Sequence, residues 1–186
     1  IGAPSLVALP RGALVGTSSL RRQCQISAVR PDIRFASVRG NIDTRLRKLA
    51  AGEYGALVLA MAGLKRLGLH RTAKALALDP WSECTPAPAQ GVIAIDCRAD
   101  DFYARKLLHT IADRETTIAA EIERTVLAGL AGGCSLPLGC YARRIGAHWR
   151  LRARLGMDVG MIEVDLEGPR PRLADQALAG LRRQHR

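Results

Sequence analysis

The sequence predicts an α/β domain followed by a smaller α+β domain. In the first part of the chain, short apolar runs alternate with segments that carry apolar residues at helical spacing, which is typical of α/β domains. A proline-rich segment without periodicity separates that part from three alternating strands divided by glycines. With 186 residues, 48% of them hydrophobic, the chain is long enough to bury substantial cores.

The first part is expected to contain three strands and two helices. Residues 12–16 form an apolar strand that ends at the hydroxyl cluster Thr17-Ser18-Ser19, which is typical of a helix N-cap. The helix that follows should end at Arg30, because Pro31 disfavours helical geometry in the residue before it. The remaining elements are expected to be a strand over 33–38, a helix from Ile42 that ends at Gly52, and a strand over 55–61.

The second part should begin after a linker over residues 79–91, which is rich in proline. An apolar run over 92–97 predicts a strand directly after the linker. The later elements are expected to be helices over 104–112 and 115–128, antiparallel strands over 140–145, 149–155 and 161–166, and a last helix over about 174–183.

The charge of the chain favours an anionic partner. Lys and Arg number 28 against 17 Asp and Glu, which gives a net charge of +11. Aromatic residues make up only 4%, too few for the base stacking that nucleic-acid binders use. Arg outnumbers Lys, and its planar fork also suits small organic polyanions. No apolar run reaches the length of about 18 residues that a membrane helix needs, so we expect a soluble, cytoplasmic protein.

The strongest local signal for an anion site is the strand-to-helix junction Gly16–Arg22. Free backbone N–H groups and the positive end of a helix dipole attract anions there. Arg21 and Arg22 in the first turn oppose that dipole, and a bound anion would remove the conflict. The alternative is that Ser18 simply caps the helix and both arginines lie in solvent.

Three further arginines occupy comparable places in the predicted α/β domain. Arg39 follows a strand, Arg45 lies early in a helix, and Arg66 lies just beyond the third strand. Ligands of open α/β sheets bind at the carboxyl ends of strands, so together with the first pair these residues could form a carboxylate-binding wall. Alternatively, each is a separate solvated charge.

Cys134 is the second chemical signal. Two glycines precede it and Pro137 and Gly139 follow it, so an irregular loop would hold an accessible thiol. The alternative is an inert cysteine that packs as a small apolar residue, the role that we assign to the other four cysteines, Cys24, Cys84, Cys97 and Cys140. The four histidines show no spacing typical of metal ligands, so no metal is expected.

Five segments together resemble the porphobilinogen deaminase (hydroxymethylbilane synthase) family in order and spacing. They are Val15–Gln23, Val38–Leu46, Ala62–Leu67, Gln90-Gly91 and Gly132–Cys134. The resemblance implies a transferase of tetrapyrrole (haem, chlorophyll and corrin) biosynthesis. Such an enzyme condenses four porphobilinogen units, with loss of ammonia, into hydroxymethylbilane on a covalently bound dipyrromethane cofactor.

The resemblance also implies the residues of the site and the partners. The cofactor would be attached to Cys134 by a thioether, with porphobilinogen and growing linear oligopyrroles as ligands. No nucleic acid, membrane or metal would take part, and the protein would be a monomer. The side chains that would hold cofactor and substrate carboxylates are Thr17, Ser18, Ser19, Arg21, Arg22, Arg39, Arg45 and Arg66.

The chain departs from the family pattern in one respect. The family's first domain, which carries a catalytic aspartate, has no counterpart here, so we expect the polypeptide alone to be inactive. Residues 1–89 would then be domain two, a mixed-sheet domain like those of periplasmic binding proteins. Residues 90–112 would return to the absent domain one, leaving the strand at 92–97 without partners, and residues 113–186 would be domain three, with the cofactor cysteine.

Two rival functions remain open from the sequence. The chain could be only an anion-binding module of the solute-binding type, in which case Cys134 would stay an unmodified thiol. It could instead be a basic nucleic-acid binder, which salt-dependent binding to mixed DNA sequences would reveal.

Overall fold

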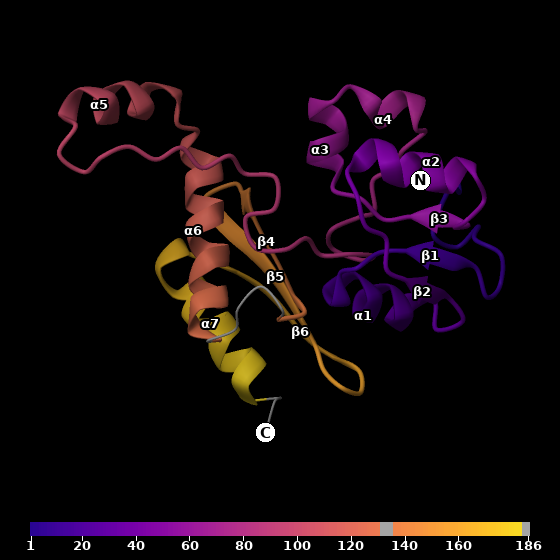
Figure 1. Cartoon of the computed structure of the whole chain (residues 1–186). Coiled ribbons are helices and arrows are strands. Elements are labelled where there is room, and N and C mark those ends of the chain that lie inside the picture. Colours follow the sequence, from indigo (N-terminus) through magenta and orange to yellow (C-terminus); the bar gives the residue numbers. More distant parts are fainter. Residues whose placement is uncertain (131–135, 184–186) are drawn as a thin grey trace.

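The computed structural model describes residues 1–130 and 136–183. Two small sheets form two parts of the molecule, and the linker passes from one to the other (Figure 1). Each part has its own hydrophobic core, the larger of which lies in the second part. None of the helices in the described ranges is long and apolar enough to cross a membrane.

The first sheet is parallel. Its strands are β1 (Leu14–Gly16), β2 (Arg34–Ala36) and β3 (Ala56–Leu57), in the order β2-β1-β3. Both pairings are parallel, so the expected mixed sheet is wrong for the described residues. The physical reason is that a helix lies between consecutive strands. Each helix returns the chain to the end of the sheet where the previous strand began, so the next strand runs in the same direction.

Helix α1 (Leu20–Val29) begins and ends close to the predicted positions. Ser19 is its N-cap and Arg30 its C-cap. The alternative that Ser18 caps this helix is wrong, because the Ser18 hydroxyl instead lies 2.8 Å from the Ser37 hydroxyl and donates to the carbonyl of Val38 (3.1 Å). Ser18 therefore joins the ends of β1 and β2.

Helix α2 (Ile42–Ala50) has Asn41 as its N-cap, whose side chain accepts from the Thr44 N–H.

The third strand is shorter than predicted. After β3 the chain turns at once into α3 (Met61–Arg66) and α4 (Leu69–Thr72), so most of the predicted strand over 55–61 is a connection. The alanine and methionine at its end suit a helix start as well as a strand.

The predicted strand over 92–97 is absent from the structure. That segment forms no ladder with any strand of the described chain, and Val92, Ile93 and Ile95 are exposed. An apolar run becomes a strand only where another strand satisfies its backbone N–H and C=O groups. The linker over 79–91 contains turns and no helix or strand.

From residue 102 onward, the elements of the second part are the predicted ones. Strands β4 (Leu138–Ile145), β5 (His148–Gly156) and β6 (Met161–Gly168) form an antiparallel sheet in the order β4-β5-β6. Helices α6 (Arg114–Gly129) and α7 (Arg170–Arg183) pack against this sheet and against each other. Helix α5 (Phe102–Ile111) stands apart from both sheets in Figure 1.

Polar contacts hold the linker between the two parts. The buried side chain of Gln25 on α1 exchanges two hydrogen bonds with the backbone of Thr85. The buried guanidinium of Arg154 on β5 donates to the carbonyls of Trp81 and Ser82, both at 3.2 Å. The Cys140 N–H donates to the carbonyl of Pro86 (2.8 Å), so the linker contacts α1, β4 and β5.

Candidate functional site

Arg21 forms the buried base of the site. It lies in the first turn of α1 with only 6% of its surface exposed. Its Nη1 donates to the Thr85 carbonyl (2.5 Å) and lies 3.8 Å from Cys84 Sγ, and its Nη2 donates to Gln90 Oε1 (3.1 Å). Burial lowers the pKa of this guanidinium from its ordinary value. Arg21 therefore fixes the linker to the helix start.

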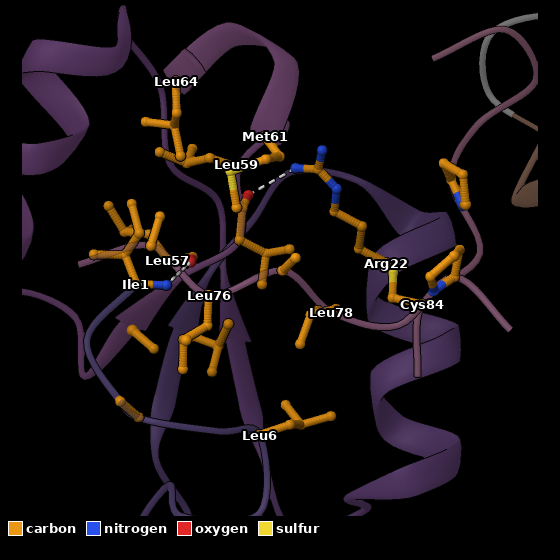
Figure 2. Close-up of a pocket in the computed structure, with 18 of the residues that line it drawn as sticks. Ile1, Leu6, Arg22, Leu57, Leu59, Met61, Leu64, Leu76, Leu78 and Cys84 are labelled. Carbon is orange, nitrogen blue, oxygen red and sulfur yellow. Dashed lines mark hydrogen bonds between the residues drawn. The ribbon is translucent and has the colours of Figure 1, made fainter. Parts of the chain in front are cut away.

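Arg22 lies beside it at the edge of a cavity of about 300 Å³ (Figure 2). Its Nη1 donates to the carbonyl of Val58 (2.7 Å), directly after β3. The pKa of Arg22 is lowered first by burial and then by the nearby positive charges of Arg21 and Arg45. Apart from these arginines, the cavity wall is mostly apolar.

Of the other three arginines, Arg45 and Arg66 are linked to this pair, and Arg39 has no such link in the part of the chain that the structure describes. Arg45 is half-buried, donates through Nε to the Gly40 carbonyl (2.9 Å) and is close enough to influence Arg22. Arg66 is exposed and donates to the carbonyl of Gly91 (2.6 Å), the residue after the partner of Arg21. Arg39 is exposed and makes no hydrogen bond or ion pair within the described chain.

These five arginines have no acidic partners among the residues that the structure describes. The ion pairs within residues 1–130 and 136–183 lie elsewhere, with Arg30, Lys48, Arg98, Arg150, Arg152, Arg154 and Arg170 as their cations. Arg21 and Arg45 lie close enough to Arg22 to repel it, which costs free energy unless an anion neutralises these charges. All five follow the carboxyl ends of the parallel strands β1, β2 and β3, where ligands of α/β sheets bind. The arrangement thus favours a ligand with several carboxylates.

The three hydroxyl residues of the junction play different parts. Thr17 is buried, and its Oγ1 accepts from the Ser19 N–H (3.3 Å), so it shapes the turn from within. Ser18 is exposed and bonded to the second strand as described above. Ser19, the N-cap, makes no capping hydrogen bond with its side chain. Its hydroxyl and the free N–H groups of the first helical turn are donors for an anion.

Cys134 lies outside the described residues. Before that segment, α6 ends at Gly129, and after it, β4 begins at Leu138. Of the other cysteines, Cys140 is buried, and burial raises its pKa well above the ordinary value. Cys97 is exposed, so its predicted role as a small core residue is wrong, because the segment that carries it packs against no sheet.

Sequence reasoning missed a buried acid close to the site. Glu123 on α6 is only 5% exposed, and its carboxylate accepts from the backbone N–H groups of Ala89 (2.6 Å) and Ala142 (2.8 Å). Burial raises its pKa, and these two hydrogen bonds oppose that rise. A signal was present, since Glu123 lies at helical spacing from Ala119 and Val126 on the apolar face of α6. In residues 1–130 and 136–183, no group of three or more His, Cys, Asp or Glu side chains could hold a metal ion.

Comparison with known proteins shows the family of the chain. Residues 2–106 match the family model "Porphobilinogen deaminase, dipyromethane cofactor binding domain", and residues 117–168 match "Porphobilinogen deaminase, C-terminal domain". A porphobilinogen deaminase of Streptococcus sanguinis (strain SK36) is 44% identical over 181 residues, which cover 95% of this chain and 59% of the relative. The chain thus spans about three-fifths of the length of that relative. Since a family model covers more than half of its residues, the chain belongs to the porphobilinogen deaminase family.

Proposed function

We propose that this chain supplies the carboxylate-binding and cofactor-bearing part of a porphobilinogen deaminase, which forms hydroxymethylbilane from porphobilinogen. The observation that carries the proposal is the group of arginines without acidic partners at the carboxyl ends of β1, β2 and β3. Porphobilinogen carries an acetate and a propionate, and each added pyrrole brings two more carboxylates. Bidentate Arg–carboxylate pairs are the strongest protein contacts available to such a chain.

The proposed roles follow from what each side chain has free. Arg22 and Arg45 each use a single N–H group in the hydrogen bonds described above, which leaves the others for ligand carboxylates. Arg21 is largely occupied and holds the floor of the site, while Arg39 and Arg66 extend its rim. Ser18 and Ser19, with Thr17 behind them, would add hydroxyl and backbone donors at the start of α1.

The donor set also fits a dipyrromethane, because that group carries carboxylates of the same kind as the substrate. In this proposal Cys134 holds it by a thioether. When bound, the dipyrromethane supplies the pyrrole carbon to which the first substrate unit is joined. The residues of this chain bind and orient carboxylates, and the apolar wall of the cavity at Arg22 excludes water from their ion pairs.

The domain boundaries belong to the same proposal. Residues 1–89 would be a domain like those of periplasmic binding proteins, residues 90–112 a segment that packs on a further domain, and residues 113–186 the cofactor-bearing domain. The separate cores of the two parts and the unpaired, exposed segment over 92–97 support this division. A cytoplasmic monomer is part of the proposal as well.

Intact-mass spectrometry tests the cofactor assignment. The chain is incubated with porphobilinogen, with and without the region of the Streptococcus sanguinis relative that this chain does not match. With that region present, we expect the mass of a dipyrromethane to be added to the wild-type chain and to be absent from Cys134→Ser. Cys97→Ser is the matched control, since its thiol is exposed and the residue belongs to no strand. Bound porphobilinogen with an unmodified thiol under all conditions would instead favour an anion-binding module.

A further inference from the structure

The carboxylate of Glu123 connects three segments of the chain through backbone contacts. Its Oε2 accepts from the Ala89 N–H in the linker, and its Oε1 accepts from the Ala142 N–H in β4. Glu123 itself lies on α6 and forms no ion pair with a cation of the described residues. A buried carboxylate satisfied only by N–H groups fixes the positions of those groups strongly, because charge-assisted hydrogen bonds are about twice as strong as neutral ones.

The linker residue that Glu123 holds has an unfavourable backbone conformation. Ala89 has a φ of +57°, in the left-handed region that a side chain with a Cβ disfavours. The turn around it is closed by hydrogen bonds from the Gln90 N–H to the Ala87 carbonyl (2.9 Å) and from the Val92 N–H to the Ala89 carbonyl (3.1 Å). The bond to Glu123 therefore helps to hold a turn that alanine does not prefer.

The next two residues of that turn contact the proposed site. Gln90 Oε1 accepts from Arg21, and the Gly91 carbonyl accepts from Arg66. A change in the turn would thus move the partners of two arginines together. On its other side, Glu123 is attached to α6 and β4, the elements on either side of the segment that contains Cys134.

We propose that Glu123 is a positioning residue, which holds the Ala89–Gly91 turn against Arg21 and Arg66 and sets it in register with the elements that flank Cys134. This inference rests on the proposed function, because it assumes that the site to which Arg21 and Arg66 belong binds ligand carboxylates. Glu123 touches no ligand in this account and acts only through the turn.

Glu123→Gln in the full chain is the test, with Glu121→Gln as its matched control. Glu121 lies on the same helix, is exposed and pairs with Arg170 instead of the linker. The Gln amide presents one oxygen and one NH₂ group, so it can accept from only one of the two N–H groups. Losing a charge-assisted bond should raise amide hydrogen exchange at Ala89 and Gln90 about ten- to hundred-fold, and should weaken porphobilinogen binding by a similar factor. The control should change neither.

A second substitution separates positioning from a general loss of stability. Glycine adopts positive φ freely, so adding Ala89→Gly to Glu123→Gln should restore much of the porphobilinogen affinity, although the carboxylate stays absent. If Glu123→Gln does not fold, Glu123→Asp, whose shorter side chain cannot reach both N–H groups, replaces it in both measurements.

Two results would overturn the proposal. One is unchanged exchange at Ala89 in Glu123→Gln, and the other is a double variant that binds porphobilinogen no better than the single one. A wild-type chain that binds no porphobilinogen would refute the proposed function instead. The exchange measurement would still decide whether Glu123 holds the turn.

Discussion

Replacing Gln25 by Leu should weaken the attachment of the linker to helix α1. Gln25 is 1% exposed, its Nε2 donates to the Thr85 carbonyl (3.1 Å), and its Oε1 accepts from the Thr85 N–H (2.7 Å). Leu has a similar volume but no acceptor, so a buried N–H group would lose its partner. The Thr85 carbonyl would keep its bond from Arg21. An unsatisfied buried donor costs about 1–3 kcal/mol, and this is the expected loss in the free energy of unfolding.

Urea denaturation followed by circular dichroism measures that loss. In a separate thermal unfolding measurement on a chain of this length, we expect the melting temperature to fall by about 2–4 °C for each kcal/mol lost. The control is Gln176→Leu, the same substitution at an exposed position of α7, which should change the free energy by no more than about 0.5 kcal/mol. A Gln25→Leu variant as stable as the wild type would refute the reasoning, because the Thr85 N–H would then have another acceptor.

Three further predictions follow from the same structure. Leu151→Ala, at a fully buried position of β5, should lower the free energy of unfolding by about 2–5 kcal/mol in urea denaturation, and a loss well below that range would contradict the described core. Hydrogen bonds from Arg150 lower the pKa of Asp165 from its ordinary value of 3.8. The difference in stability between wild type and Asp165→Asn should therefore be present at neutral pH and be lost as the pH falls below 3.8. A difference that persists in strong acid would count against the pair. The 186-residue polypeptide alone should form no hydroxymethylbilane from porphobilinogen, and turnover measured by absorbance would show that its own residues suffice for catalysis.

The fold was predictable where the pattern is local. The three antiparallel strands each carry alternating apolar residues bounded by glycines, and every predicted range lies within the observed strand. Helix α1 was predictable at both ends from the hydroxyl cluster and Pro31. The strand over 92–97 was predicted wrongly, because its apolar run has the right local character and the structure offers it no sheet edge.

The sequence located the arginines of the candidate site but not the buried residues that support it. The positions of Arg21 and Arg22 follow from a motif that the sequence shows directly. Gln25, Glu123 and Arg154 are buried and bond to linker residues 60, 34 and 73 positions away, respectively. Polar residues on amphipathic helices and strands are usually solvated, so only the tertiary structure reveals that these three hold the linker.

Calorimetric titration with porphobilinogen tests the central claim that the arginines of the proposed site, Arg21, Arg22, Arg39, Arg45 and Arg66, bind carboxylates. Arg22→Gln removes the half-buried guanidinium at the cavity. Arg34→Gln removes an exposed guanidinium that donates to the Gly12 carbonyl (3.0 Å). Arg34 is the first residue of β2, so it lies at the opposite end of that strand from the carboxyl end where the site is proposed. We expect Arg22→Gln to weaken binding by about ten-fold or more, and Arg34→Gln to leave it unchanged. Equal affinities for the wild type and both variants would contradict the claim.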